Sequence, residues 1–151
     1  MTAIKFLAVA AVCLSTALGA SAQRNKTIKE IMDMKGVEST FVSKVYRDSD
    51  DKEGINLNPS LEKKGVKGTY LIDIDYDKDD EETKNNKALI KKVYGMLEDM
   101  VSNSKYQLLM RTKDDDEVTY MYGIPKGSKG YEEQIMISKS DDELSIIYYE
   151  W

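Results

Sequence analysis

The chain contains no histidine, and its single cysteine is Cys13 near the N-terminus. Ser-His-Asp and Cys-His hydrolases are therefore excluded, because both need an imidazole as the general base. Zinc sites are disfavoured, since zinc is normally held by histidine or cysteine. Catalysis by carboxylates, lysine or tyrosine stays open, as does binding of a hard cation through oxygen ligands. We expect neither an enzyme nor a cofactor.

The first 22 residues have the order of a secretory signal peptide. Lys5 precedes an apolar run over residues 6–18, and small residues fill positions 19–22. The run is short for a membrane span and polar residues follow it directly, so no integral membrane segment is expected after signal removal. We predict cleavage near Ala22 and export to the periplasm or the extracellular space as a soluble protein. Residues 23–151 are then expected to form one α+β domain.

Removal of this segment would also remove Cys13, which leaves a mature chain without a disulfide. The loss of Lys5 leaves 21 basic residues against 27 acidic ones, a net charge of −6. An acidic domain without a basic stripe is a poor partner for nucleic acid. We therefore expect no nucleic-acid partner.

The first part of the mature chain predicts a short helix and an edge strand. Thr27 with Glu30 three residues later resembles a capping box, and Gly36 is a typical stop, which predicts a helix from about 27 to 35. Residues 37–46 alternate as a half-buried or edge strand would. Residues 47–65 form a long polar connection. Its acidic run does not match a calcium loop, because Lys52 and Glu53 stand where a ligand and the glycine belong.

The clearest strand pattern covers residues 66–77. One face carries Tyr70, Ile72, Ile74 and Tyr76, whereas the other is largely acidic. Asp73, Asp75 and Asp77 on that second side are weak candidates for a cation site. They do not form an EF-hand, because Lys78 stands in place of the required glycine.

A long helix is predicted over residues 83–102, where apolar residues recur at steps of three and four. The expected buried stripe is Leu89, Val93, Met96 or Leu97, and Met100 or Val101. Residues 106–151 then read as four strands with turns at 113–116, 125–130 and 139–143. Short connections of this kind predict an antiparallel meander.

The predicted fold is α+β: an antiparallel sheet of about six strands, including the four-strand C-terminal meander, with the long helix on one face and a short N-terminal helix. Matching apolar residues across the hairpins predicts two rows beneath the helix. The first is Leu108, Tyr122, Ile135 and Tyr148. The second is Met110, Tyr120, Ile137 and Ile146.

The same register aligns apolar residues on the opposite face of the sheet, which we call the second face. Those predicted to bind a partner are Leu109, Met121, Met136, Ile147, Tyr149 and Trp151. In one reading, the N-terminal helix or the connection over residues 47–65 covers this stripe. In the other, the stripe is exposed and binds a protein partner, another copy of the chain or an apolar ligand.

The chain resembles the secreted Bacteroidetes family known as domain of unknown function 4252. The resemblance rests on the signal peptide, the segment Gly36-Val37-Glu38-Ser39-Thr40-Phe41-Val42-Ser43-Lys44, the helix over residues 91–101, and Tyr106-Gln107-Leu108-Leu109-Met110 with the closing strands. The chain differs after Tyr46, where the family would have a more apolar helical segment. The resemblance implies no activity and no functional residue.

Three functional hypotheses remain. The leading one is a non-enzymatic periplasmic or cell-surface binding or accessory protein that uses the second face. The alternatives are a carboxylate-dependent enzyme, which needs two acids facing each other across a cleft, and a cation-binding structural module built on Asp73, Asp75 and Asp77.

Overall fold

The computed structural model describes residues 22–44, 65–128 and 130–151. The predicted signal peptide up to residue 21 and most of the polar connection, with its acidic run, lie outside these residues. The chain divides into two compact units, residues 1–34 and 35–151, and the second unit holds the whole described sheet.

In the first unit, residues 22–32 are helical. The Thr27 hydroxyl donates to the Gln23 carbonyl at 3.1 Å, a bond made inside a helix by a residue facing the preceding turn. The prediction that Thr27 caps the helix is therefore wrong, because the helix already includes the residues before it. Ile28 and Ile31 lie three residues apart and are both fully buried. Gly36 adopts a left-handed φ of 88° in the turn that follows, as the predicted stop requires.

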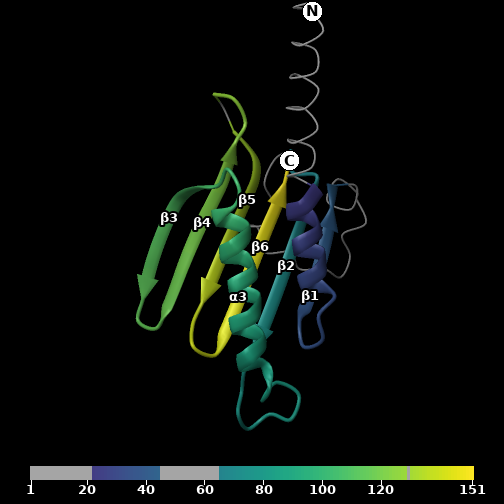
Figure 1. Cartoon of the computed structure of the whole chain (residues 1–151), viewed down its shortest axis with the longest axis vertical. Coiled ribbons are helices and arrows are strands. Elements are labelled where there is room, and N and C mark those ends of the chain that lie inside the picture. The colour runs from purple at the N-terminus through teal and green to yellow at the C-terminus, as the bar shows by residue number, and fades with distance from the viewer. Residues whose placement is uncertain (1–21, 45–64, 129) are drawn as a thin grey trace, which may run out of the picture. The chain divides into compact units, whose positions relative to one another are not determined.

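The second unit contains a six-stranded antiparallel sheet in the described residues, in the order β1-β2-β6-β5-β4-β3 (Figure 1). Its strands are β1 (Glu38–Ser43), β2 (Gly68–Asp75), β3 (Gln107–Asp114), β4 (Glu117–Pro125), β5 (Tyr131–Lys139) and β6 (Glu143–Glu150). The helix α3 (Asn86–Ser102) connects β2 to β3. The predicted α+β fold and the four-strand meander are confirmed. Pairing of β2 with β6 joins the first two strands to the meander and leaves β1 and β3 as the two edges.

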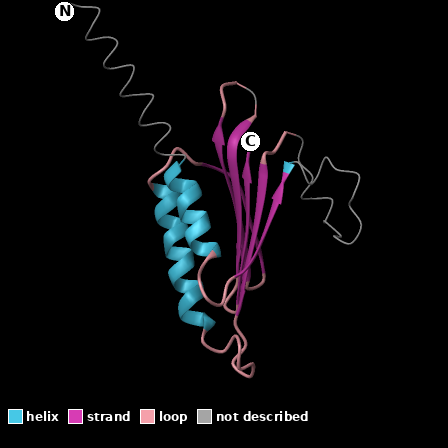
Figure 2. Cartoon of the chain, turned by 90° about the vertical axis from the view of Figure 1, so that its right-hand side faces the viewer, coloured by secondary structure: helices cyan, strands magenta, loops and turns pink. Residues whose placement is uncertain are grey.

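Helix α3 packs on β2 and β6, on one face of the sheet, and Figure 2 shows the same sheet from the side. Four apolar side chains of the helix are buried: Ile90, Val93, Leu97 and Met100. The burial of Leu97 and Met100 decides between the alternatives that the sequence left open. The prediction of Leu89 is wrong, because Leu89 is half-buried and the next residue, Ile90, is buried instead. No helix among the described residues is long and apolar enough to cross a membrane.

The helix begins at Asn86 rather than at Thr83, because the residues before it form turns. The backbone N–H of Asp77 donates to the Thr83 hydroxyl at 3.1 Å, and that of Asp79 donates to the Asp77 carboxylate at 2.9 Å. The buried Asn86 side chain then donates to the carbonyl of Asp75 at 2.9 Å, which ties the start of α3 to the end of β2. Asn103 ends the helix, as predicted.

The core lies between α3 and the sheet. The predicted row Leu108, Tyr122, Ile135 and Tyr148 is confirmed, and it continues through Tyr70 to Phe41. The second predicted row is confirmed from Tyr120 through Ile137 to Ile146, but Met110 is not its end: Arg111 lies opposite Tyr120 instead. The members of these rows on β2, β5 and β6 are buried, whereas Phe41 and Leu108 at the two sheet edges are half-exposed. Full burial of one large apolar side chain stabilises the fold by roughly 2 kcal/mol.

Candidate functional site

A β-bulge in β3 determines what the second face carries at its edge. The register shifts between Leu108 and Met110, so that Met110 lies opposite Met121. The extra residue is Leu109, and its Cδ1 lies 2.8 Å from the position that a Cβ on Gly123 would occupy. Gly123 belongs to the second face with Met121, so the bulge turns both Leu109 and Met110 to that side. The prediction that Leu109 pairs with Met121 is wrong by one residue.

The second face is built of three adjacent rows. Its central row is apolar and crosses five strands as Leu71, Ile147, Met136, Met121 and Met110. On one side lie Thr69, Tyr149, Gln134 and Gly123, all buried. On the other side lie Asp73, Ser145, Ser138, Thr119 and Thr112, which form a polar row.

The predicted partner-binding residues differ in their exposure. Tyr149 is 4% exposed and presents no surface to a partner, while Trp151 beside it is half-buried, with ring centroids 5.9 Å apart. Ile147, Met136 and Met121 are half-buried. Exposure is highest at the bulge, where Leu109 is 36% exposed and Met110 41%. The accessible part of the face is therefore the end of the apolar row at β3.

Strand β3 is an edge strand whose eight residues are all exposed. Leu108, on the α3 side, is 55% exposed, so three consecutive large apolar residues stand at this edge. Edge strands carry backbone groups that can pair with another chain, and exposed apolar edges are the ones that do so most readily. The charged residues Arg111 and Lys113 disfavour such pairing in the second half of the strand.

The acidic candidates for a cation site do not converge. The Asp73 carboxylate accepts a hydrogen bond from the Ser145 hydroxyl, and Asp77 accepts one from the backbone of Asp79. Asp75 lies at the exposed end of β2, opposite Glu143. The part of the chain that the structure describes holds no group of three or more acidic, histidine or cysteine side chains placed to bind a metal ion.

A buried polar cluster on the α3 side was not predicted. Glu133 is 2% exposed and accepts a hydrogen bond from the Tyr106 hydroxyl at 3.0 Å. Burial, and then the nearby Glu133 carboxylate, raise the pKa of Tyr148 well above its usual range. The alternation along β5 could have revealed this cluster, since Glu133 has the same parity as Ile135 and Ile137. Because Glu133 accepts hydrogen bonds from Tyr106 and Tyr148 inside the fold, we assign it a structural role.

No protein-family model, no curated protein and no solved structure matches this sequence.

Proposed function

We propose that this chain is an exported, non-enzymatic binding protein that contacts a protein partner through the second face at β3. The observation that carries the proposal is the apolar row from Leu71 to Met110, which is half-buried as far as Met121 and ends at the edge strand in exposed side chains. Export rests on the N-terminal sequence pattern. The non-enzymatic role rests on the lack of histidine and, after signal removal, of cysteine, which excludes hydrolysis by an imidazole base or a thiol nucleophile.

The chemistry of this surface favours a partner with an extended apolar segment. Leu109 and Met110 offer flexible apolar contacts, and methionine adapts well to different shapes. The outer edge of β3 offers backbone groups for an added strand. Among the described residues of the second unit, the only helix lies on the opposite face, so an added strand at β3 would extend the apolar row without displacing α3.

The proposal can be tested by replacing two apolar residues that face each other across neighbouring strands with residues of opposite charge. Met121 lies directly opposite Met136, so Met121→Lys with Met136→Glu places opposite charges together. We expect this variant to stay folded, with a loss of unfolding free energy of about 1 kcal/mol, because both side chains are only half-buried. A partner captured from the periplasmic fraction by the wild-type protein should be lost by the variant.

The matched control is Tyr120→Lys with Ile137→Glu, the neighbouring pair on the opposite face. That variant should unfold, because Ile137 is buried in the core. If both variants unfold alike, the second face is core and the proposal is wrong. Sedimentation of the wild-type protein distinguishes a second copy of the chain from a different partner, since self-association would appear without any added protein.

A further inference from the structure

The α3 side of the sheet carries a groove that the core does not fill. Helix α3 packs mainly on β2 and β6. It therefore covers β4, which lies next to the edge strand β3, less completely. Between the second half of the helix and the strands β4 and β5 lies a groove of about 370 Å³. This volume lies at the small end of the range for ligand sites. The groove lies on the other face of the sheet from the proposed partner surface.

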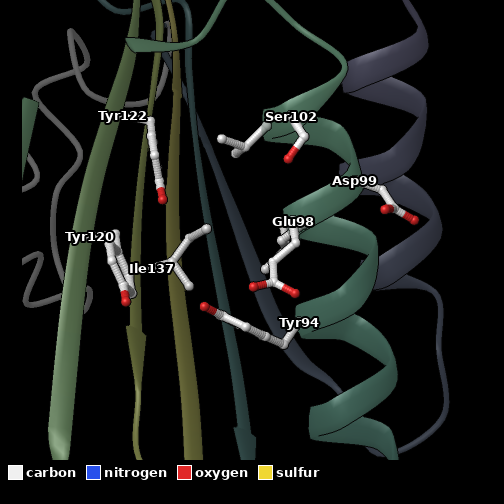
Figure 3. Close-up of a pocket in the computed structure, with 9 residues that line it drawn as sticks. Tyr94, Glu98, Asp99, Ser102, Tyr120, Tyr122 and Ile137 are labelled. Atoms are coloured by element: carbon white, nitrogen blue, oxygen red, sulfur yellow. The ribbon is translucent and has the colours of Figure 1, made fainter. Parts of the chain in front are cut away.

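Three tyrosines and a glutamate provide the chemistry of this groove. Tyr94 and Glu98 extend from α3 towards Tyr120 and Tyr122 of β4 (Figure 3). The rings of Tyr120 and Tyr122 are nearly parallel, with an interplanar angle of 17° and centroids 6.0 Å apart. Asp99 also lines the groove, but its carboxylate points away from the tyrosines (Figure 3).

Tyr94 and Tyr122 remain uncharged at neutral pH. Burial and the Glu98 carboxylate raise the pKa of Tyr94 to about 12. Burial, with Tyr120 and Glu98 nearby, also raises the pKa of Tyr122. The only formal charges among the groove-lining residues are therefore those of Glu98 and Asp99. Aromatic rings beside a carboxylate attract cations, because the ring face carries negative electrostatic potential.

Two of the rings already contact cationic side chains of the protein. The Lys139 ammonium lies 4.2 Å from the centroid of Tyr94, and the Arg111 guanidinium lies 5.8 Å from that of Tyr120. Arg111 reaches Tyr120 because the bulge in β3 turns it to this face. Within the described residues, neither Lys139 nor Arg111 forms an ion pair with a carboxylate. The rings of Tyr94 and Tyr120 thus already attract positive charge, and a cationic ligand would compete with Lys139 and Arg111 for them.

We propose that the groove formed by Tyr94, Glu98, Tyr120 and Tyr122 binds a small organic cation with an alkylated ammonium group. Such a group is weakly hydrated, so it loses little solvation when it contacts aromatic rings. Glu98 supplies the neutralising charge, and the volume fits a compact head group. A bare metal ion suits the groove less well, because its strong hydration would have to be replaced by more than one carboxylate.

The test compares choline with its neutral isostere 3,3-dimethylbutan-1-ol, both titrated into the purified protein. Shifts in the NMR resonances of the tyrosine rings report binding, at concentrations up to about 50 mM for a weak site. We expect choline to shift the rings of Tyr94, Tyr120 and Tyr122, and the isostere to leave them in place. Equal shifts with the two ligands would mean that shape rather than charge is recognised, and would overturn the proposal. So would no shift with choline.

Three substitutions sharpen this result without disturbing the core. Glu98→Gln should weaken choline binding about fivefold, whereas Asp99→Asn, its matched control one residue away, should weaken it less than twofold. Lys139→Met should strengthen binding about twofold to threefold, because it removes both a competitor for Tyr94 and a repelling charge. If Asp99→Asn and Glu98→Gln act equally, or if Lys139→Met weakens binding, the cation is not held in this groove.

Discussion

The two faces of this sheet carry apolar residues in the same alternating pattern, but these residues differ in burial. On the α3 face, Ile146 is 1% exposed and belongs to a continuous buried layer. Its neighbour Ile147 has the same chemistry but lies on the second face and is half-buried. Apolar alternation alone therefore does not show which face is the core. The position of α3 decides it, because the helix covers β2 and β6 on one face, whereas the apolar row of the second face stays half-buried and ends in exposed residues at β3.

The adjacent isoleucines give the largest expected difference between the faces. Ile146→Ala should lower the free energy of unfolding by about 4 kcal/mol, because it leaves a cavity in a layer that cannot collapse. Ile147→Ala should cost about 1 kcal/mol, since its side chain is already partly in water. Urea unfolding followed by circular dichroism measures both values. Equal losses would break the distinction between the two faces.

A second test uses the buried tyrosine of the α3 face. Tyr148 has a raised pKa in the fold, so above about pH 10 the unfolded state releases its proton first and stability falls as the pH rises. One such tyrosine contributes a slope of about 1.4 kcal/mol per pH unit in that range. Tyr148→Phe should make the alkaline slope of the unfolding free energy shallower by this amount. It should also cost about 2 kcal/mol at neutral pH, because buried Glu133 loses a donor.

An unchanged alkaline slope in Tyr148→Phe would contradict the burial of this hydroxyl.

A smaller change in stability is expected on the second face, beside the bulge in β3. A Cβ on Gly123 would lie 2.7 Å from Tyr131 Cδ1 and 2.8 Å from Leu109 Cδ1. Gly123→Ala should therefore push these side chains outward and cost about 1 kcal/mol of stability. Gly95→Ala on α3 has nothing within 4 Å and should instead stabilise the helix by about 0.7 kcal/mol. Thermal unfolding distinguishes the signs, and a stabilised Gly123→Ala would contradict the position of Leu109.

The smallest expected effect concerns Thr69, whose buried hydroxyl has no hydrogen-bond partner. Thr69→Val keeps the shape of the side chain and removes the unsatisfied oxygen, so it should stabilise the protein by about 0.5 kcal/mol. The unfolding midpoint in urea measures the gain. A clear loss of stability would show that the hydroxyl is hydrogen-bonded in solution.

The sequence predicts the strands and the confirmed row from Leu108 to Tyr148 because both depend on local alternation and short turns. It does not predict the bulge at Leu109, although three consecutive apolar residues in an otherwise alternating segment are a signal for one. The tyrosine groove depends on where α3 crosses the sheet, and Tyr94 and Tyr120 come together only through that tertiary position. Glu133 alternates in phase with the buried Ile135 and Ile137 of the same strand, so its burial could have been predicted from the sequence.

Oxidation of the methionines by hydrogen peroxide tests most directly whether the second face is accessible while the α3 face is core. Met110, Met121 and Met136 lie in the apolar row of the second face, and Met100 is buried on α3. Mass spectrometry of the native protein should find Met110 oxidised first, then Met121 and Met136, with Met100 protected until unfolding. If Met121 and Met136 are as protected as Met100, the second face is closed and the proposed binding surface does not exist.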